Sequence, residues 1–246
     1  MMRWVVRILL GCVAAIMLLC GFAGFYFLVY SADLPDLYVL ERYAPARSAR
    51  VSDPCLPGES IALPYSSIGY NFRSAMTAAE GYQQRGEVML RDQISRTMLC
   101  APSKNLVRQL KGARIAAQLR WHFSRDELLT IYANRAQFGE DCIGIQAAAE
   151  HYFHKQPDQL DIAEAALLAG LIQRPSYLSP YTHADRALQH RNQVIDAMVK
   201  DHAISVEQGE AAKATSLSVT PSNPHLWQCI LGKDASQPSG VAPSMT

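Results

Sequence analysis

The chain has 246 residues, and its 23 lysines and arginines nearly balance its 22 aspartates and glutamates. This balance removes the electrostatic case for a nucleic-acid-binding protein, which needs a basic surplus or a basic stripe. Hydrophobic residues make up 49% of the sequence, a share raised by the N-terminus and otherwise ordinary for a packed domain. The part after residue 30 has the length of one globular domain.

An uncharged segment, ILLGCVAAIMLLCGFAGFYFLVY, covers residues 8–30. As a helix it would span about 34 Å, enough to cross a hydrocarbon layer of about 30 Å. Arg3 and Arg7 precede it, so the positive-inside rule places the N-terminus in the cytoplasm. A cleaved signal peptide is the alternative, but the run is too long and no clear cleavage site follows it. We therefore expect a single-pass anchor in the inner (cytoplasmic) membrane, with the domain on the periplasmic or extracytoplasmic side.

Six cysteines are present, and two of them lie in the apolar segment. The other four, in the part expected to be exported, are Cys55, Cys100, Cys142 and Cys229. Four cysteines allow three pairings, among which the sequence does not choose. An oxidising compartment permits such bridges. No Cys-x-x-Cys spacing indicates zinc.

Residues 31–57 contain four prolines and no regular period, which is typical of a connector that packs loosely on its domain. In the segment NFRSAMTAAE, apolar or small residues then recur at the spacing of one helix face. They are Phe72, Ala75, Met76 and Ala79. This pattern predicts a helix that ends near Glu80, with Gly81 as its stop signal.

Further helices are expected over residues 91–100, 105–123, 124–138, 165–172, 184–201 and 205–215. Ser124 followed by Glu127 is a capping box, in which each side chain satisfies free backbone N–H groups of the first turn. Asp161 and Glu164 repeat the pattern. The segment from residue 231 onward is rich in Gly, Ser and Pro and is expected to be disordered. No strand pattern stands out, so the sequence predicts an all-α domain.

Three stretches carry a family resemblance: SRDELLTIYANRAQFG, GIQAAAEHYFHKQPDQLDIAEAALLAGLIQRPSYLSPY and HRNQVIDAM. They resemble glycosyltransferase family 51, the peptidoglycan glycosyltransferases of class A penicillin-binding proteins and of monofunctional biosynthetic transglycosylases. The family motif K-x-x-I-L-x-x-Y-L-N-x-x-x-x-G is matched by Arg125, Leu128, Leu129, Tyr132, Asn134 and Gly139. The motif R-x-x-x-V-L-x-x-M is matched by Val194, Ile195 and Met198, with His190 in place of its arginine. The resemblance is near-colinear over residues 106–213.

The resemblance implies a lysozyme-like, all-helical head with a smaller membrane-dipping jaw, preceded by a single transmembrane helix. The expected units are residues 1–30 (cytoplasmic N-terminus and anchor), 31–57 (connector), 58–215 (glycosyltransferase-like domain) and 216–246 (tail, partly disordered). The implied reaction joins lipid II units into glycan strands. One glutamate acts as general base on the acceptor hydroxyl, and a second, in the motif R-K-x-x-E, assists at the leaving group. Arg and Lys groups, with a divalent ion in some members, offset the leaving diphosphate.

Glu80 falls at the position of the family's catalytic base, because LPYSSIGYNFRSAMTAAEG resembles the stretch leading into E-D-x-x-F-x-x-H-x-G. Beyond it the match fails: Gly81 replaces the aspartate, and no H-x-G follows. The motif G-x-S-T-I-T-Q-Q arrives far too early as GEVMLRDQ, which keeps Gly86 and Gln93 but loses the serine and threonines. The resemblance therefore implies a jaw segment shortened by deletion.

The motif R-K-x-x-E keeps only its arginine: Arg108 remains, Gln109 replaces the lysine and Gly112 replaces the glutamate. Two carboxylates with separate roles are thereby reduced to one, and no spacing supports Glu87 or Asp92 as a substitute. The residues carried over by the resemblance are the catalytic Glu80 and the substrate-binding set Gln93, Arg96, Arg108 and Lys111. Apart from the divalent ion of some family members, no cofactor is implied.

Each of these residues also has a plainer interpretation. Glu80 could be a helix-end residue, although a glutamate there opposes the helix dipole. Arg108 and Lys111 could form a solvated face of an amphipathic helix. Asn134 and Tyr132 are expected to brace the fold rather than touch substrate. A further pair, His151 and His154, sits at i, i+3 without additional ligands, so no metal site is predicted.

Two functions remain open at this point. The first is a trimmed peptidoglycan glycosyltransferase that still uses Glu80; the second is a non-catalytic protein that binds lipid II, nascent glycan or another cell-wall synthesis protein. A lysozyme-type hydrolase is a weaker third, since that chemistry uses two carboxylates or a positioned water and only Glu80 is evident. The expected surroundings are the membrane and lipid II or nascent glycan, with no nucleic acid.

Overall fold

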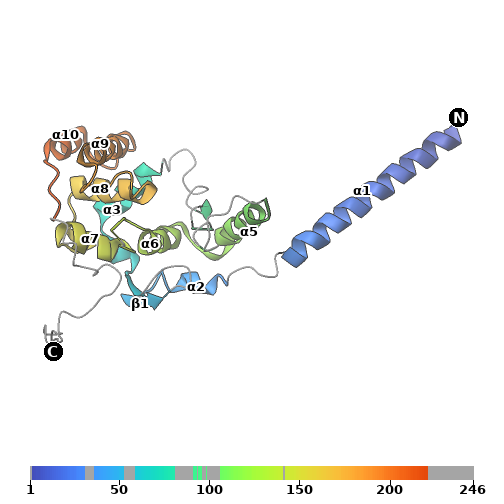
Figure 1. Cartoon of the computed structure of the whole chain (residues 1–246), viewed down its shortest axis with the longest axis horizontal. Coiled ribbons are helices and arrows are strands. Elements are labelled where there is room, and N and C mark those ends of the chain that lie inside the picture. The colour runs from blue at the N-terminus through green and yellow to red at the C-terminus, as the bar shows by residue number, and fades with distance from the viewer. Residues whose placement is uncertain are drawn as a thin grey trace, which may run out of the picture.

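The computed structural model describes residues 2–30, 36–52, 59–80, 91–92, 94–95, 98, 106–140 and 142–220. Its elements, in chain order, are α1 (Met2–Tyr30), α2 (Tyr38–Glu41), β1 (Ala49–Ser52), β2 (Glu59–Ala62), the 3-10 turn η1 (Tyr65–Ile68), α3 (Tyr70–Ala79), α5 (Leu106–His122), α6 (Arg125–Arg135), α7 (Ile145–Phe153), the 3-10 turn η3 (Pro157–Gln159), α8 (Ile162–Gln173), α9 (Ala184–Lys200) and α10 (Val206–Ala214). Figure 1 shows them in one view. The predicted all-α class is confirmed.

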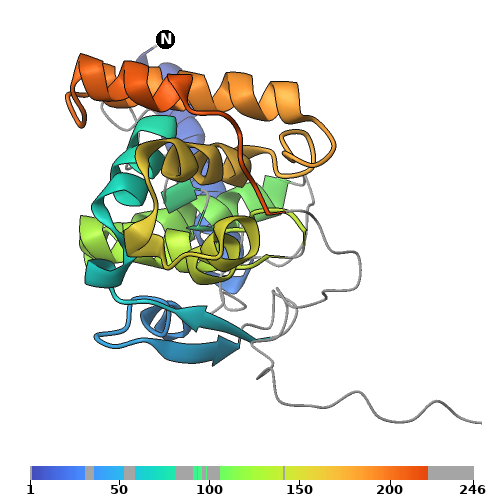
Figure 2. The ribbon, with the colours of Figure 1, turned by 90° about the vertical axis from the view of Figure 1, so that its left-hand side faces the viewer.

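The helices stack in layers. Figures 1 and 2 show α9 and α10 on one side, α3 and α8 beneath them, α6 and α7 below these, and the β1–β2 hairpin at the far end. Helix α8 lies at the centre, packed against α3 and α9. Eight of its residues are buried, so this helix is apolar around its whole circumference, as expected for a core helix.

A two-stranded antiparallel sheet pairs β1 with β2, in a register that runs from Ala49 opposite Ala62 to Ser52 opposite Glu59. The sequence analysis did not predict it. In β1 only Val51 is buried, so the strand carries no hydrophobic alternation from which it could be recognised.

The connector packs firmly, which makes the expectation of loose packing wrong. Leu40 and Tyr43 are 0% and 1% exposed and belong to the main hydrophobic core. The side chain of Asn134 on α6 joins the connector, at Tyr43, to the segment after β2, at Leu63. Its Nδ2 donates to the carbonyl oxygens of Tyr43 and Leu63, at 2.8 Å each, and its Oδ1 accepts from the Leu63 N–H at 3.0 Å. The prediction that Asn134 braces the fold is confirmed.

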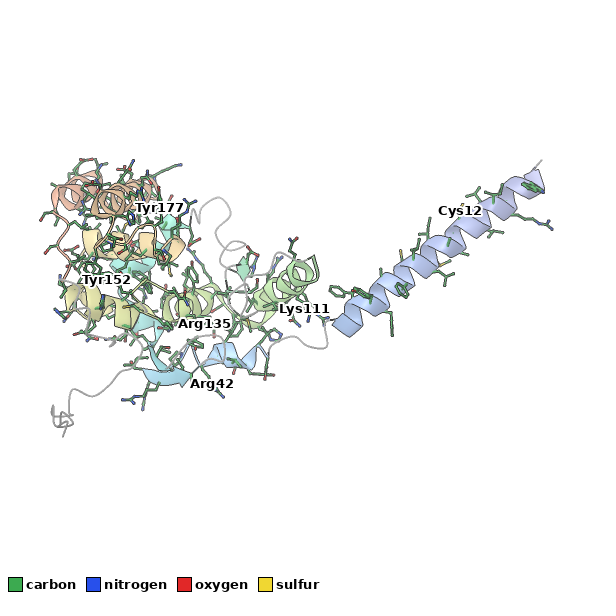
Figure 3. The ribbon with its side chains drawn as sticks, in the orientation of Figure 1. Cys12, Arg42, Lys111, Arg135, Tyr152 and Tyr177 are labelled. Atoms are coloured by element: carbon green, nitrogen blue, oxygen red, sulfur yellow. The ribbon has the colours of Figure 1, made fainter. Side chains whose placement is uncertain are left out.

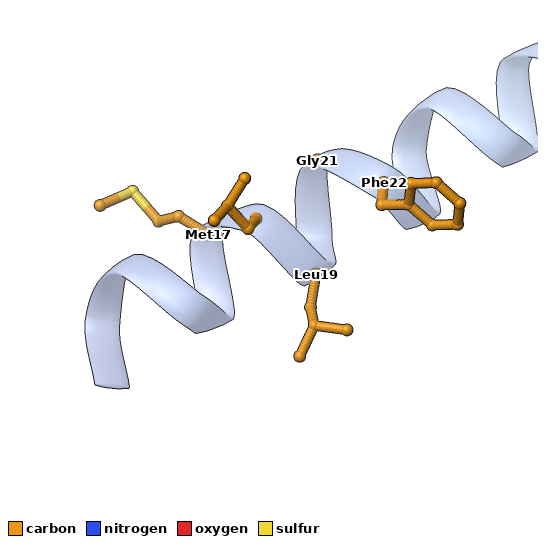
Figure 4. Close-up of a pocket in the computed structure, with 5 residues that line it drawn as sticks. Met17, Leu19, Gly21 and Phe22 are labelled. Atoms are coloured by element: carbon orange, nitrogen blue, oxygen red, sulfur yellow. The ribbon is translucent and has the colours of Figure 1, made fainter. Parts of the chain in front are cut away.

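Helix α1 projects away from the layered domain (Figure 1). Its stretch Val6–Phe27 has a mean hydropathy of 2.5 and is long and apolar enough to cross a membrane. None of it is buried against the rest of the protein. Near its end the Phe27 ring lies 5.4 Å from the guanidinium carbon of Arg114 on α5. A hollow beside Gly21 on this helix, lined by Met17, Leu18, Leu19 and Phe22, is the gap that a glycine leaves between large apolar side chains (Figure 4).

Several sequence-based expectations fall outside the described residues. They concern the stop signal at Gly81, the disordered tail after residue 231 and three of the exported cysteines, Cys55, Cys100 and Cys229. The fourth, Cys142, is buried and disulfide-bonded, and its partner lies outside the described residues. Cys12 and Cys20 on α1 are free.

Both predicted capping boxes form. The Ser124 hydroxyl accepts from the Glu127 N–H, and Glu127 Oε2 accepts from the Ser124 N–H at 2.7 Å. The pair Asp161 and Glu164 does the same at the start of α8. We expect Ser124→Ala to lower the free energy of unfolding by about 1 kcal/mol, because an N–H of the first turn loses its acceptor.

Chemical denaturation of the full chain in detergent measures this cost. Ser216→Ala is the matched control, because Ser216 is exposed and lies beyond the last helix. Equal midpoints for Ser124→Ala and Ser216→Ala would show that the cap contributes nothing.

Candidate functional site

Glu80 is the C-cap residue of α3, as the sequence predicted. Its N–H donates to the carbonyl oxygen of Met76 at 3.2 Å, which closes the last turn. The neighbouring carbonyl of Ala79 accepts a 2.6 Å hydrogen bond from Nε2 of Gln173, the last residue of α8. The core helix α8 therefore fixes the backbone that carries Glu80.

The Glu80 carboxylate does not point into bulk solvent. The hydroxyl of Tyr132 on α6 donates to its Oε1 at 3.0 Å, and Tyr132 is itself 4% exposed. Burial raises the pKa of Glu80 above its ordinary value, because desolvation disfavours the charged form; the hydrogen bond from Tyr132 opposes part of this rise. A desolvated carboxylate with a raised pKa binds a proton more readily than an exposed one, which suits a general base.

The contact of Tyr132 with the candidate base was not predicted from the sequence. Tyr132 was predicted only to brace the fold, yet its hydroxyl is the described group that contacts the candidate base. The tyrosine belongs to the same motif as Asn134, one helical turn of α6. Nothing in the local sequence indicates which of the two side chains faces α3.

The predicted substrate-binding residues near Glu80 are only partly described. Gln93 and Arg96 lie outside the described residues, and of Arg108 only the backbone is described, within α5. Lys111 is half-buried on α5, and Figure 3 shows it at the side of the domain that faces the end of α1. The convergence of these residues on Glu80 stays a prediction.

No second carboxylate accompanies Glu80 among the described residues. Among the described residues, neither an acidic nor a basic group is a cause of its pKa shift. Gly112, which stands where the motif R-K-x-x-E has its glutamate, is buried and has no side chain to offer. Glu87 lies outside the described residues. The described residues also hold no group of three or more potential metal-ligating His, Cys, Asp or Glu side chains.

Comparison with known proteins places this site in a family. The profile of a family described as Transglycosylase matches residues 66–199, a range that contains Glu80, Tyr132 and Asn134. The chain belongs to the transglycosylase family. The resemblance to glycosyltransferase family 51 is thereby confirmed.

The relatives are larger proteins. Penicillin-binding protein 1A of Escherichia coli is 30% identical over 156 residues, which cover 63% of this chain and 18% of that protein. Penicillin-binding protein 1A of Mycolicibacterium smegmatis is 42% identical over 106 residues, which cover 43% and 14%. A crystal structure of penicillin-binding protein 1A from Haemophilus influenzae aligns with a TM-score of 0.45 at 21% identity, over 66% of this chain and 18% of that one. The chain spans less than a fifth of the length of these relatives.

One departure from the motifs of the transglycosylase family, His190, affects how two helices pack. His190, which replaces the arginine of R-x-x-x-V-L-x-x-M, buries its Nδ1 against Gly170 of α8, where an added Cβ would lie 2.8 Å from that nitrogen. The next residue, Arg191, is 2% exposed and was not singled out from the sequence. It donates to the carbonyl oxygens of Lys213 and Thr215, at 3.0 and 2.8 Å, and so satisfies free carbonyls at the end of α10.

His151 and His154 lie at the edge of the core and at the surface. His154 is exposed, and His151 is half-buried with its ring edge-on to Tyr152, 4.9 Å between centroids. Burial lowers the pKa of His151. Glu127 is a cap, as predicted, and its carboxylate is bonded to Ser124.

The raised pKa of Glu80 predicts a pH-dependent cost of folding. Below pH 4.5 the carboxyl is neutral in both states; as the pH rises through the raised folded pKa, only the folded state must bury a charge. Glu80→Gln removes this charge and keeps a side-chain oxygen that can accept the hydrogen bond from Tyr132. We therefore expect the variant to gain stability over the wild type at pH 7 and much less at pH 4.

Thermal unfolding at both pH values measures the difference. Glu41→Gln is the control, because Glu41 is exposed and pays no burial cost. A Glu80→Gln variant that is no more stable than the wild type at pH 7 would contradict the burial of the charge.

Proposed function

We propose that this protein is a membrane-anchored, peptidoglycan glycosyltransferase-like protein of cell-wall biogenesis that binds lipid II, with weak or absent turnover. One observation carries the proposal: the carboxylate at the position of the family base is desolvated and hydrogen-bonded to a motif tyrosine, Tyr132. A glutamate that merely ended a helix would gain nothing from this burial.

In the proposed reaction Glu80 takes the proton of an acceptor sugar hydroxyl as that oxygen attacks the anomeric carbon of a lipid-linked donor. Its raised pKa makes it a stronger base once ionised, and Tyr132 fixes which oxygen receives the proton. The leaving diphosphate must meet positive charge, which we assign to Arg96, Arg108 and Lys111, with Gln93 as a further substrate contact. No step of this scheme is assigned to a divalent ion, since the described residues hold no group of three or more potential metal-ligating side chains.

Weak turnover follows from what the motifs have lost. In R-K-x-x-E the lysine is replaced by Gln109, whose side chain is exposed, and the glutamate by the buried Gly112. Loss of one positioned acid–base group lowers a rate by a factor of about 10² to 10⁴. The binding surface does not depend on these two positions alone. We therefore expect the chain to bind the lipid-linked substrate even though its turnover is weak or absent.

The second candidate function is a non-catalytic one. A domain that holds lipid II or nascent glycan without polymerising it would serve as a scaffold for another cell-wall synthesis protein. The absence of a second carboxylate beside Glu80 in the described residues favours this function.

We place the domain on the periplasmic or extracytoplasmic side of the inner membrane, anchored by α1. Arg3 precedes the apolar stretch Val6–Phe27, and Arg7 lies at its start. The positive-inside rule keeps both arginines in the cytoplasm. The disulfide at Cys142 supports this orientation, because such bonds persist in oxidising compartments.

The test compares the wild type with Glu80→Gln in a membrane, measuring glycan strand formation and, separately, lipid II binding. We expect little or no polymerisation by either protein and similar binding by both. Glu41→Gln controls for the loss of a glutamate elsewhere. Robust polymerisation by the wild type that Glu80→Gln abolishes would establish Glu80 as a working base and overturn weak turnover. Absence of both polymerisation and binding would refute the proposed function.

A further inference from the structure

A group of cationic and aromatic side chains lies where α8 ends and α9 begins. The guanidinium carbon of Arg186 lies 4.5 Å from the ring centroid of Tyr177, and that of Arg174 lies 6.0 Å from it. The His183 ring is nearly parallel to the Tyr177 ring, at 21° and 6.4 Å. We call these four residues the Tyr177 patch; Figure 3 marks Tyr177 beside the layer of α3 and α8.

The positive charge of this patch has no counterion in the described part of the chain. The ion pairs there involve other residues, and neither Arg174 nor Arg186 is paired with a carboxylate. Asp185, the acidic residue next to Arg186, forms no ion pair with it. Stacking on Tyr177 instead holds the two guanidinium groups on one ring, where like charges repel.

The start of α9 adds the positive end of its helix dipole, which Asp185 in the first turn partly offsets. His183 is its N-cap residue and makes no side-chain cap, so the first N–H groups of this helix of 17 residues have no side-chain acceptor at the N-cap. Arg186 lies in the first turn, where a cation opposes the helix dipole. An unpaired arginine at an uncapped N-terminus is an unfavourable arrangement that a bound anion would relieve.

The patch is accessible and is tied to the backbone that carries Glu80. Tyr177 is 50% exposed. The N–H groups of Tyr177 and Leu178 both donate to the carbonyl of Arg174, at 3.1 and 3.0 Å, which fixes the turn. Arg174 directly follows Gln173, whose side chain holds the carbonyl of Ala79. A substrate that reaches Glu80 from this side of α8 would pass the patch.

We propose that the Tyr177 patch binds an oxyanion, a carboxylate or a phosphate, of the glycan substrate served by Glu80. The two planar guanidinium groups supply paired N–H donors that match the two oxygens of such a group, and Tyr177 holds them in position. This inference rests on the proposed function for the identity of the substrate. The patch acts by positioning substrate and takes no part in proton transfer.

The experiment measures equilibrium binding of two probes by the full chain in detergent: inorganic diphosphate, and an uncross-linked peptidoglycan fragment whose peptide carries free carboxylates. We expect Arg174→Gln/Arg186→Gln to weaken binding of at least one probe about tenfold or more, because hydrogen bonds from charged groups are lost. The probe affected identifies the source of the oxyanion. Tyr177→Phe, which keeps the ring, should bind as the wild type does, and Tyr177→Ala should bind more weakly.

Arg120→Gln is the matched control, since Arg120 also lies over an exposed aromatic ring, that of Trp121 at 5.8 Å, and no second cation of the described residues lies on it. Equal affinity of the double variant, the control and the wild type for both probes would overturn the proposal, as would a wild type that binds neither. Lipid II binding by the wild type, measured alongside, separates this outcome from failure of the proposed function: if lipid II binds while the patch variants leave both probes unaffected, only the patch proposal fails.

Discussion

One turn of α6 holds the connector and the candidate base to the same core. The Asn134 side chain makes three hydrogen bonds with the backbone of Tyr43 and Leu63, and the hydroxyl of Tyr132, two residues earlier, donates to Glu80. A buried amide or hydroxyl without a partner costs free energy, so these bonds leave the surrounding segments few alternative positions. The placement of Glu80 depends on this turn of α6 as much as on α3.

Of the two carboxylates in the family motifs, the chain keeps one at the matching position, Glu80. Burial that raises the pKa of Glu80 destabilises the folded chain at neutral pH, which is the stability cost usual for a functional carboxylate. The partner carboxylate expected on α5 is absent because Gly112 occupies its place. The chain keeps a carboxylate that lowers its stability but has lost the partner carboxylate. This combination favours a protein that recognises substrate over one that turns substrate over rapidly.

Local signals made much of the fold predictable from the sequence. The capping boxes at Ser124 and Asp161 and the end of α3 near Glu80 each depend on residues a few positions apart, and all three are confirmed. The contacts that were missed join distant segments: Tyr132 to Glu80 across 52 residues and Asn134 to Tyr43 across 91. Sequence periodicity indicates which face of a helix is buried, but it does not indicate which side chain on that face meets a given partner.

The placement of Glu80 as a half-buried carboxylate supported by Tyr132 can be measured directly. Carbon-13 NMR of labelled glutamate carboxyls, with the Glu80 signal assigned by its loss in Glu80→Gln, measures its titration directly. We predict a midpoint above the ordinary glutamate value of 4.5, and a still higher one in Tyr132→Phe, where the hydrogen bond to the charged form is removed. A midpoint at or below 4.5 that Tyr132→Phe leaves unchanged would contradict the account.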